Sequence, residues 1–168
     1  LGSHVCDIIK FLSGETPQQI MAVQHSFGHF SHLIDNCMSI AKYTNNLIAN
    51  IWFSKSAIGY RNGLRVRVHG SKGSMEWHQM EPEHLILNSN QSIRSIIDRG
   101  YIHSNESAIP RYNRFKAGHP AGFIEAFSNY YYDIADRLAA PGSQNSPYIF
   151  GIDSAYEGIR MLEAMQES

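Results

Sequence analysis

Residues 64–78 read LRVRVHGSKGSMEWH, and this stretch decides the fold class. Its first half alternates aliphatic and polar residues, which is typical of a strand with one buried face. Gly70-Ser-Lys-Gly73 predicts a tight turn, and residues 74–78 return as a partner strand. We therefore expect a β-hairpin whose inward-facing side chains on the first strand are Leu64, Val66 and Val68.

Further short strands are expected on both sides of this hairpin, with no helix between them. Asn45-Asn46 is a two-residue turn that tolerates positive φ and favours a second hairpin. Consecutive short strands of this kind indicate an antiparallel meander. The segments concerned are residues 18–27, 37–43, 47–54, 84–87 and 92–97.

Helical patterns lie at the two ends of the chain. Residues 4–12 and 122–139 repeat apolar residues at helical spacing, and a last helix is expected to begin at a Ser154–Glu157 capping box. We expect Ile159, Leu162 and Met165 to form the buried side of that last helix. The order predicts an α+β fold: an open, mainly antiparallel β-sheet with helices packed on one face.

The composition of the chain limits the classes of function that it can have. Charged residues make up 17% of the 168 residues, against about 25% in a typical soluble domain, so we expect part of the surface to be covered. A net charge of −1 argues against nucleic-acid binding. The chain contains no apolar run long enough for a membrane helix and no signal-peptide pattern. Two cysteines without a metal or disulfide pattern predict reduced thiols and a cytoplasmic protein.

Common catalytic patterns are absent. His25, His29 and His32 have a spacing that a zinc site on a helix could use, but Gly28 and the preceding strand pattern favour surface histidines. We expect no metal site. The Gly70–Gly73 turn lacks phosphate-loop spacing, and no GxGxxG unit is present, so the chain has no dinucleotide-binding unit of its own.

Two histidines lie where helices are expected to begin. His4 stands at the start of the first helix, and His119 precedes the long helix at 122–139. A helix N-terminus offers unpaired N–H groups and a positive potential, and a histidine there is placed to accept a proton. Both also suit a structural role as a cap. Residues 98–121 lack a regular pattern, and a stretch of this length is typical of a functional or interfacial segment.

Four motifs follow one another along the chain. They are Gly2-Ser-His4-Val-Cys-Asp7-Ile-Ile-Lys-Phe-Leu-Ser-Gly14, Gly63–Trp77 with its Gly-Ser-Lys-Gly turn, Gly118-His-Pro-Ala-Gly-Phe-Ile-Glu-Ala-Phe127, and Asp153–Ser168. Together they resemble the C-terminal domain of the Gfo/Idh/MocA family, the NAD(P)-dependent glucose–fructose oxidoreductase and inositol dehydrogenase relatives. The sequence departs from the family pattern at Ala121, where the family commonly has Glu.

The resemblance implies that residues 1–168 are the substrate-binding and oligomerisation domain of a two-domain sugar or polyol dehydrogenase. An absent N-terminal Rossmann domain would bind NAD or NADP. His4 would be the catalytic base, with His119, Tyr112 and Arg111 as substrate contacts. A homo-dimer or tetramer formed through the open sheet face is expected, and the chain alone is expected to be inactive. The alternative is a non-catalytic binding or dimerisation module that uses the same sheet face.

Overall fold

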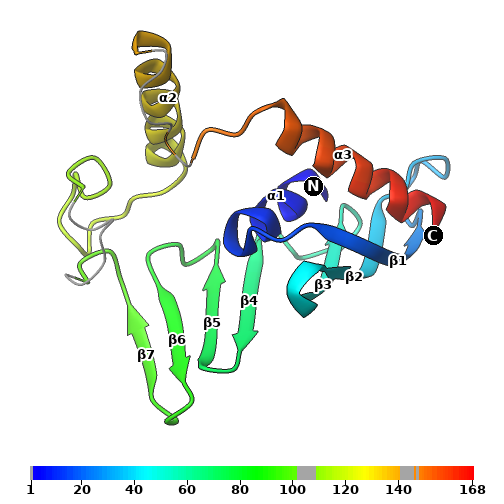
Figure 1. Cartoon of the computed structure of the whole chain (residues 1–168), viewed down its shortest axis with the longest axis horizontal. Coiled ribbons are helices and arrows are strands. Elements are labelled where there is room, and N and C mark those ends of the chain that lie inside the picture. The colour runs from blue at the N-terminus through cyan, green and yellow to red at the C-terminus, as the bar shows by residue number, and fades with distance from the viewer. Residues whose placement is uncertain (1, 102–108, 141–145, 147) are drawn as a thin grey trace. The chain divides into compact units, whose positions relative to one another are not determined.

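A computed structural model describes residues 2–101, 109–140, 146 and 148–168. The chain forms two compact units, one of Leu1–Gly59 with Phe150–Ser168 and one of Tyr60–Ile149. The part of residues 98–121 that lies at 102–108 falls outside the described residues. The fold is α+β, as predicted, with three α-helices and two antiparallel sheets among the described residues (Figure 1).

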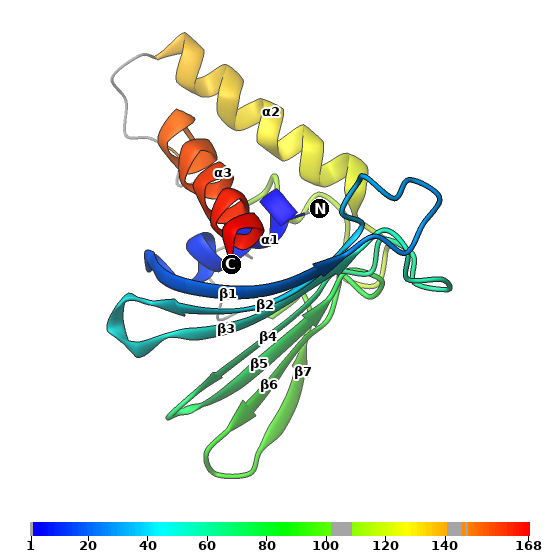
Figure 2. The same cartoon turned by 90° about the vertical axis from the view of Figure 1, so that its right-hand side faces the viewer.

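The first unit is a three-stranded sheet with helices on one face. Its sheet has the order β1-β2-β3, and every neighbouring pair is antiparallel. The helices α1 and α3 lie over the same face of this sheet (Figure 2). The elements are α1 (Gly2–Ser13), β1 (Pro17–His25), β2 (Asn36–Tyr43), the short 3-10 turn η1 (Thr44–Asn46), β3 (Ile48–Ser54) and α3 (Ile152–Glu167).

The positive φ values predicted for Asn45 and Asn46 are confirmed, but the connection between the two strands has four residues, 44–47, rather than two. Asn45 and Asn46 have φ values of 51° and 61° between β2 and β3, a conformation that asparagine tolerates better than most residues. Gly14 ends α1 with a φ of 69°, and its N–H donates to the Lys10 carbonyl at 2.8 Å. These positions fix where the helix ends and where the hairpin turns.

The core of the first unit lies between the two helices and the inward face of the sheet. Gly2 of α1 is buried there, and a Cβ at this position would lie 2.5 Å from Leu162 and 2.9 Å from Phe53. A larger residue at position 2 would therefore require the Leu162 and Phe53 side chains to shift. The buried side chains are Cys6, Cys37, Ala41, Tyr43, Ile51, Met161 and Met165.

Two expectations for α3 are wrong. The helix begins at Ile152 after Gly151, and no side chain caps it, so Ser154 lies inside the helix rather than at a capping box. Glu157 instead pairs with Lys10 at 3.4 Å, which ties α3 to α1. Ile159, expected on the buried side, is 54% exposed, whereas Met165 is buried and Leu162 packs against the core as expected. Met161 is buried as well.

The second unit contains a four-stranded antiparallel sheet of order β4-β5-β6-β7. The predicted 64–78 hairpin forms its first two strands, with Val66 paired with Trp77 and Val68 with Met75. Charged residues such as Arg65, paired with His78, occupy the opposite face. The elements are β4 (Arg65–Gly70), β5 (Gly73–His78), β6 (Leu85–Ser89), β7 (Arg94–Ile97) and the helix α2 (Phe123–Ala139).

None of the helices in the described part of the chain has the length and apolar character that a membrane crossing requires.

Candidate functional site

The predicted site residues are divided between the two units. His4 lies in the first unit, whereas Arg111, Tyr112 and His119 lie in the second.

His4 lies in the first turn of α1, with an exposed side chain. Gly2 and Cys6, two residues before and after it, form the buried side of the helix. Because successive residues are about 100° apart around a helix, His4 projects away from the core. Its imidazole is therefore open to a ligand or to another domain.

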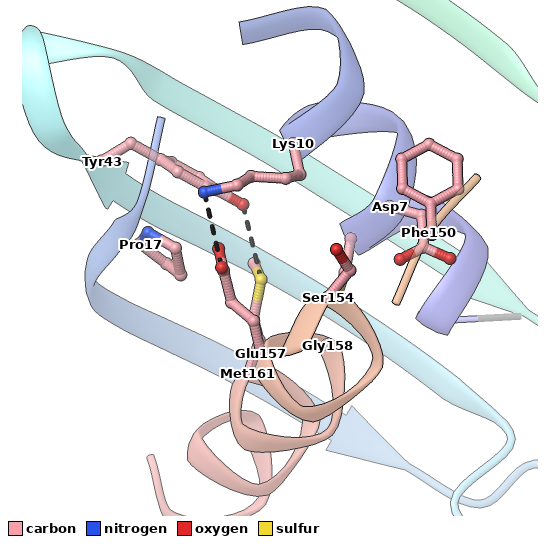
Figure 3. Close-up of a pocket in the computed structure, with 10 residues that line it drawn as sticks. Asp7, Lys10, Pro17, Tyr43, Phe150, Ser154, Glu157, Gly158 and Met161 are labelled. Carbon is pink, nitrogen blue, oxygen red and sulfur yellow. Dashed lines mark hydrogen bonds and ion pairs between the residues drawn. The ribbon is translucent and has the colours of Figure 1, made fainter. Parts of the chain in front are cut away.

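A small cavity lies beside the same helix, and Cys6, Asp7 and Lys10 of α1 help to line it (Figure 3). The Tyr43 hydroxyl donates to the Met161 sulfur at 3.4 Å there, and the Lys10–Glu157 ion pair lies beside it. The cavity volume is about 20 Å³, which is room for a water molecule and far too little for a sugar. His4 does not line it. This cavity is a feature of the core rather than the predicted substrate site.

The Cys6 thiol at this cavity is a poor nucleophile. Burial, together with the negative charge of Asp7, raises the pKa of Cys6 from 9.0 to about 11. Burial also raises the pKa of Cys37. Because the thiolate is the reactive form of cysteine, these two free, buried thiols are structural.

Arg111 and Tyr112 are held together by α2. One terminal nitrogen of Arg111 donates to the Asp133 carboxylate at 2.7 Å and to the Tyr112 hydroxyl at 2.8 Å. The guanidinium lies 4.7 Å from the ring centroid of Tyr112 and 4.8 Å from that of Tyr132. Burial opposes the charge on Arg111, but the Asp133 hydrogen bond and charge outweigh it and raise the pKa of Arg111.

This arrangement gives Arg111 a structural part that the sequence did not indicate. Asp133 is only 5% exposed, and a buried carboxylate needs a paired cation. Burial raises the pKa of Tyr112, so its hydroxyl stays protonated near neutral pH. Contact of either residue with a substrate stays a prediction.

His119 lies in a tight turn just before α2. Its N–H donates to the Lys116 carbonyl at 3.1 Å, and its ring nitrogen Nδ1 lies 3.3 Å from the same oxygen. Gly118 has a φ of +90° in this turn. Arg99 donates to the Lys116 carbonyl at 3.2 Å and also to the His119 carbonyl. Arg99, which lies outside the turn and outside every sequence motif, therefore holds the turn through its backbone carbonyls.

The three histidines with zinc-like spacing do not share a helix face. His25 ends β1, and His29 and His32 lie in the irregular connection to β2. The ring of His25 packs edge-on against Phe27, at 4.6 Å between centroids, and that of His32 against Phe30 at 6.2 Å. The sequence pattern of the preceding strand correctly favoured this placement.

One protein family matches the chain over its whole length. The model of an oxidoreductase family, C-terminal alpha/beta domain, matches residues 1–168. The chain belongs to the Gfo/Idh/MocA oxidoreductase family. The family match covers the segments that carry His4, Arg111, Tyr112 and His119, but it assigns no role to any of them.

Three relatives illustrate the similarity to this family. An uncharacterized oxidoreductase of Bacillus subtilis (strain 168), YfiI, is 27% identical over 152 residues, which is 87% of this chain and 38% of the relative. An oxidoreductase from Sinorhizobium meliloti is 29% identical with a TM-score of 0.89, covering 100% of this chain and 48% of that one. The inositol dehydrogenase homologue from Azotobacter vinelandii, complexed with NADH and myo-inositol, is 26% identical with a TM-score of 0.82, covering 98% and 45%.

The chain therefore spans less than half the length of these relatives. Its own residues do not fit a whole dinucleotide. Every strand pair among the described residues is antiparallel, whereas a dinucleotide-binding unit needs parallel strands joined through a helix.

Proposed function

We propose that this chain is the substrate-binding and oligomerisation domain of an NAD(P)-dependent dehydrogenase that oxidises a hydroxyl group of a sugar or polyol. The observation that carries the proposal is the 26% identity, over 98% of the chain, to a homologue complexed with NADH and myo-inositol. The cofactor belongs mainly to the remaining half of the full-length protein. The isolated chain is therefore inactive.

His4 is the residue proposed as general base. It takes the proton of the substrate hydroxyl while the C–H bond of the same carbon breaks. The bound nicotinamide supplies the acceptor for that hydride. An exposed imidazole in the first turn of α1 suits this role, because its Gly2 and Cys6 neighbours anchor the helix and leave the ring accessible. His119 and Tyr112 are proposed to bind other substrate hydroxyls, with Arg111 beside them.

The test uses the full-length protein with NAD or NADP and a panel of myo-inositol, glucose and xylose. We expect His4→Asn to lower kcat by about 10²- to 10⁴-fold, the usual worth of a general base. His69→Asn is the matched control, since His69 is an exposed histidine on β4. Full activity in His4→Asn would remove His4 from the mechanism, and a wild-type protein inactive with the whole panel would reject the polyol proposal.

The outward face of the first sheet supports a second part of the proposal, assembly into a homo-dimer or tetramer. Six large apolar side chains project from this face, each between 49% and 73% exposed. Strand pairing places Met21 beside Ile40 and Met38 between Val23 and Trp52, so the side chains form one patch. An apolar face of this kind is typical of an interface, and a two-fold axis is the commonest way to cover it. The residues are Met21, Val23, Met38, Ile40, Ile48 and Trp52.

The same face favours the alternative of a non-catalytic module, which predicts association without a role for His4.

The two free thiols support the further proposal that the protein works in the reducing cytoplasm.

A further inference from the structure

Two charged residues of the second unit hold the turn that carries His119. Arg99 follows β7, and its Nε lies 3.0 Å from the Glu83 carboxylate, which comes from the β5–β6 connection. The Arg99 side chain is only 16% exposed and that of Glu83 26%. Removing two charges from water costs free energy, and this chain has few charged residues. The largely buried Arg99–Glu83 ion pair is therefore unusual and suggests a specific role.

Both partners of the ion pair also bind the backbone of the turn. Arg99 donates to the carbonyl oxygens of Lys116 and His119, while the other carboxylate oxygen of Glu83 accepts the Ala121 N–H at 3.2 Å. The pair therefore holds both sides of His119, at positions 116, 119 and 121. We name these two residues the Arg99–Glu83 clamp.

The backbone around the clamp leaves the turn little freedom. A Cβ at Gly100 would lie 3.0 Å from the Ala117 side chain, so the segment after β7 packs closely against the turn. Asn113 adds a contact to the Arg99 carbonyl at 3.5 Å. The segment after the turn is fixed as well, because the Gly122 N–H donates to Glu125 of α2 at 2.9 Å.

The clamp has a consequence for the chemistry of the His119 ring. The Lys116 carbonyl that Arg99 holds is the oxygen 3.3 Å from His119 Nδ1. A carbonyl only accepts hydrogen bonds, so this contact favours the tautomer with the proton on Nδ1. Nε2 then carries the lone pair, on an exposed side chain.

We propose that Arg99 and Glu83 are positioning residues that present His119 Nε2 as a hydrogen-bond acceptor for a hydroxyl group of the sugar or polyol substrate. The proposal rests on the proposed function, in which His119 contacts the substrate. Neither Arg99 nor Glu83 needs to touch the substrate. They act by fixing the carbonyl that orients the His119 ring.

The test compares Arg99→Gln, Arg99→Lys and Glu83→Gln with His119→Ala in the full-length enzyme, using the best substrate of the panel above. We expect Arg99→Gln to raise KM about tenfold with kcat within about twofold, because misplacing a binding group weakens the complex. Lysine keeps the charge but lacks the planar fork of donors, so Arg99→Lys is expected to raise KM by a smaller factor.

The double variant Arg99→Gln/His119→Ala separates positioning from direct contact. If Arg99 acts through His119, the second substitution adds nothing to the KM of His119→Ala. Independent, multiplying effects would overturn the proposal. Arg65→Gln is the matched control, because Arg65 forms an exposed ion pair with Glu76 in the same unit, and it should leave KM unchanged.

A spectroscopic readout reports the ring directly. With ¹⁵N-histidine labelling, and the resonances assigned from His119→Ala, the wild type should show the Nδ1–H tautomer at His119. Arg99→Gln and Glu83→Gln should shift its two ring ¹⁵N signals toward the average of both tautomers. Thermal unfolding shows whether each variant is folded.

The outcomes separate the two proposals. If His119→Ala raises KM but Arg99→Gln and Arg99→Lys change neither KM nor the ring signals, the clamp is rejected and the proposed function stands. If His119→Ala leaves KM unchanged, the substrate contact of His119 is rejected, and the positioning role falls with it.

Discussion

The two faces of the β1-β2-β3 sheet are built from the same three strands, but the side chains on one face are buried and those on the other are exposed. On the inward face, Cys37, Ala41, Tyr43 and Ile51 are at most 4% exposed. On the outward face, the six-residue apolar patch stays open, with Val23 73% exposed. Because side chains alternate along a strand, neighbouring residues such as Met38 and Cys37 belong to different faces.

The difference teaches that apolarity alone does not identify a core. The inward face is covered by α1 and α3 and supplies stability to the first unit. The outward face carries the six-residue apolar patch together with polar residues such as Lys42 and Asn50, and it has no cover within the unit, so its residues contribute little to folding stability. Substitutions on the two faces should therefore change different measured quantities.

The largest effect is expected from Ile51→Ala on the inward face. Removing a buried isoleucine side chain that is 4% exposed should lower the free energy of unfolding by about 3 kcal/mol, through lost burial and the cavity left behind. Urea denaturation, followed by circular dichroism, measures the change.

Ile48→Ala is the matched control on the same strand. Ile48 is 66% exposed on the outward face, so its loss should cost less than about 1 kcal/mol at a concentration where the chain is monomeric. Equal losses in the two variants would mean that the faces do not differ as described.

The next effect is a loss of stability at alkaline pH, caused by the Cys6 thiol above the inward face. Its pKa is about 11 in the folded chain against 9.0 for an ordinary thiol. Below pH 9 both states are protonated, and the stability is complete. Between pH 9 and 11 only the unfolded thiol loses its proton, so unfolding becomes easier as pH rises, by about 2 to 3 kcal/mol in total.

Cys6→Ala isolates this contribution, because burial also raises the pKa of Tyr43 and adds its own alkaline loss in both proteins. We expect the variant to be less stable at pH 8 and to lose less stability than the wild type between pH 9 and 11. Parallel curves for the two proteins would show that Cys6 is not the group responsible.

Much of this architecture could be predicted from the sequence. The positive φ values of Asn45 and Asn46, the 64–78 hairpin and the helical pattern at 4–12 depend on local chemistry, and the structure confirms all three. Ile20 and Met21 alternate between the two faces of β1, as they do in any strand, but alternation does not say which face will be covered. That choice depends on where α1 and α3 pack, which is tertiary information.

The start of α3 and the surroundings of the candidate site were not predictable in the same way. Ser154 and Glu157 have capping-box spacing, but Lys10 competes for Glu157 from another helix. Arg99 and Glu83 are 16 residues apart, and Arg111 and Asp133 are 22 apart, so no local pattern links either pair. The only hint in the sequence was that all four residues are charged in a chain with few charged residues.

A smaller effect is expected from Met38→Lys on the outward face, and it concerns association rather than folding. Met38 lies between Val23 and Trp52 at the centre of the apolar patch. A buried lysine ammonium without a partner is unfavourable, so self-association should weaken at least tenfold, about 1.4 kcal/mol. Unfolding stability of the monomer should change by less than about 0.5 kcal/mol. Sedimentation velocity measures the association.

Ile58→Lys is the control for added charge, because Ile58 is 99% exposed and lies outside the strands. It should leave association unchanged. A wild-type chain that is monomeric at high concentration would contradict the assembly proposal, whatever the variants do.

The smallest effect is expected at the connection that continues from β1 to β2, where Phe27 packs on His25 of the outward face. The Asp35 carboxylate accepts the N–H groups of Phe27 and Gly28, at 3.0 Å and 2.6 Å, and the Ser56 hydroxyl at 3.0 Å. The hydrogen bonds that Asp35 accepts from backbone N–H groups, above all from Phe27, outweigh the effect of burial and lower the pKa of Asp35. The folded loop therefore keeps these bonds as pH falls, until Asp35 is protonated below its ordinary range.

Asp35→Asn keeps the shape of the side chain but replaces one carboxylate oxygen with a donor, so it cannot accept both N–H groups and the hydroxyl as before. We expect hydrogen exchange to quicken at the Phe27 and Gly28 amides, while the β2 amides on either side of Met38 stay protected. A variant in which the Phe27 amide exchanges as slowly as in the wild type would show that the loop is held by its aromatic contacts. If β2 loosens too, the loop and the outward face form one cooperative surface, and a partner that binds the sheet would also order residues 26–35.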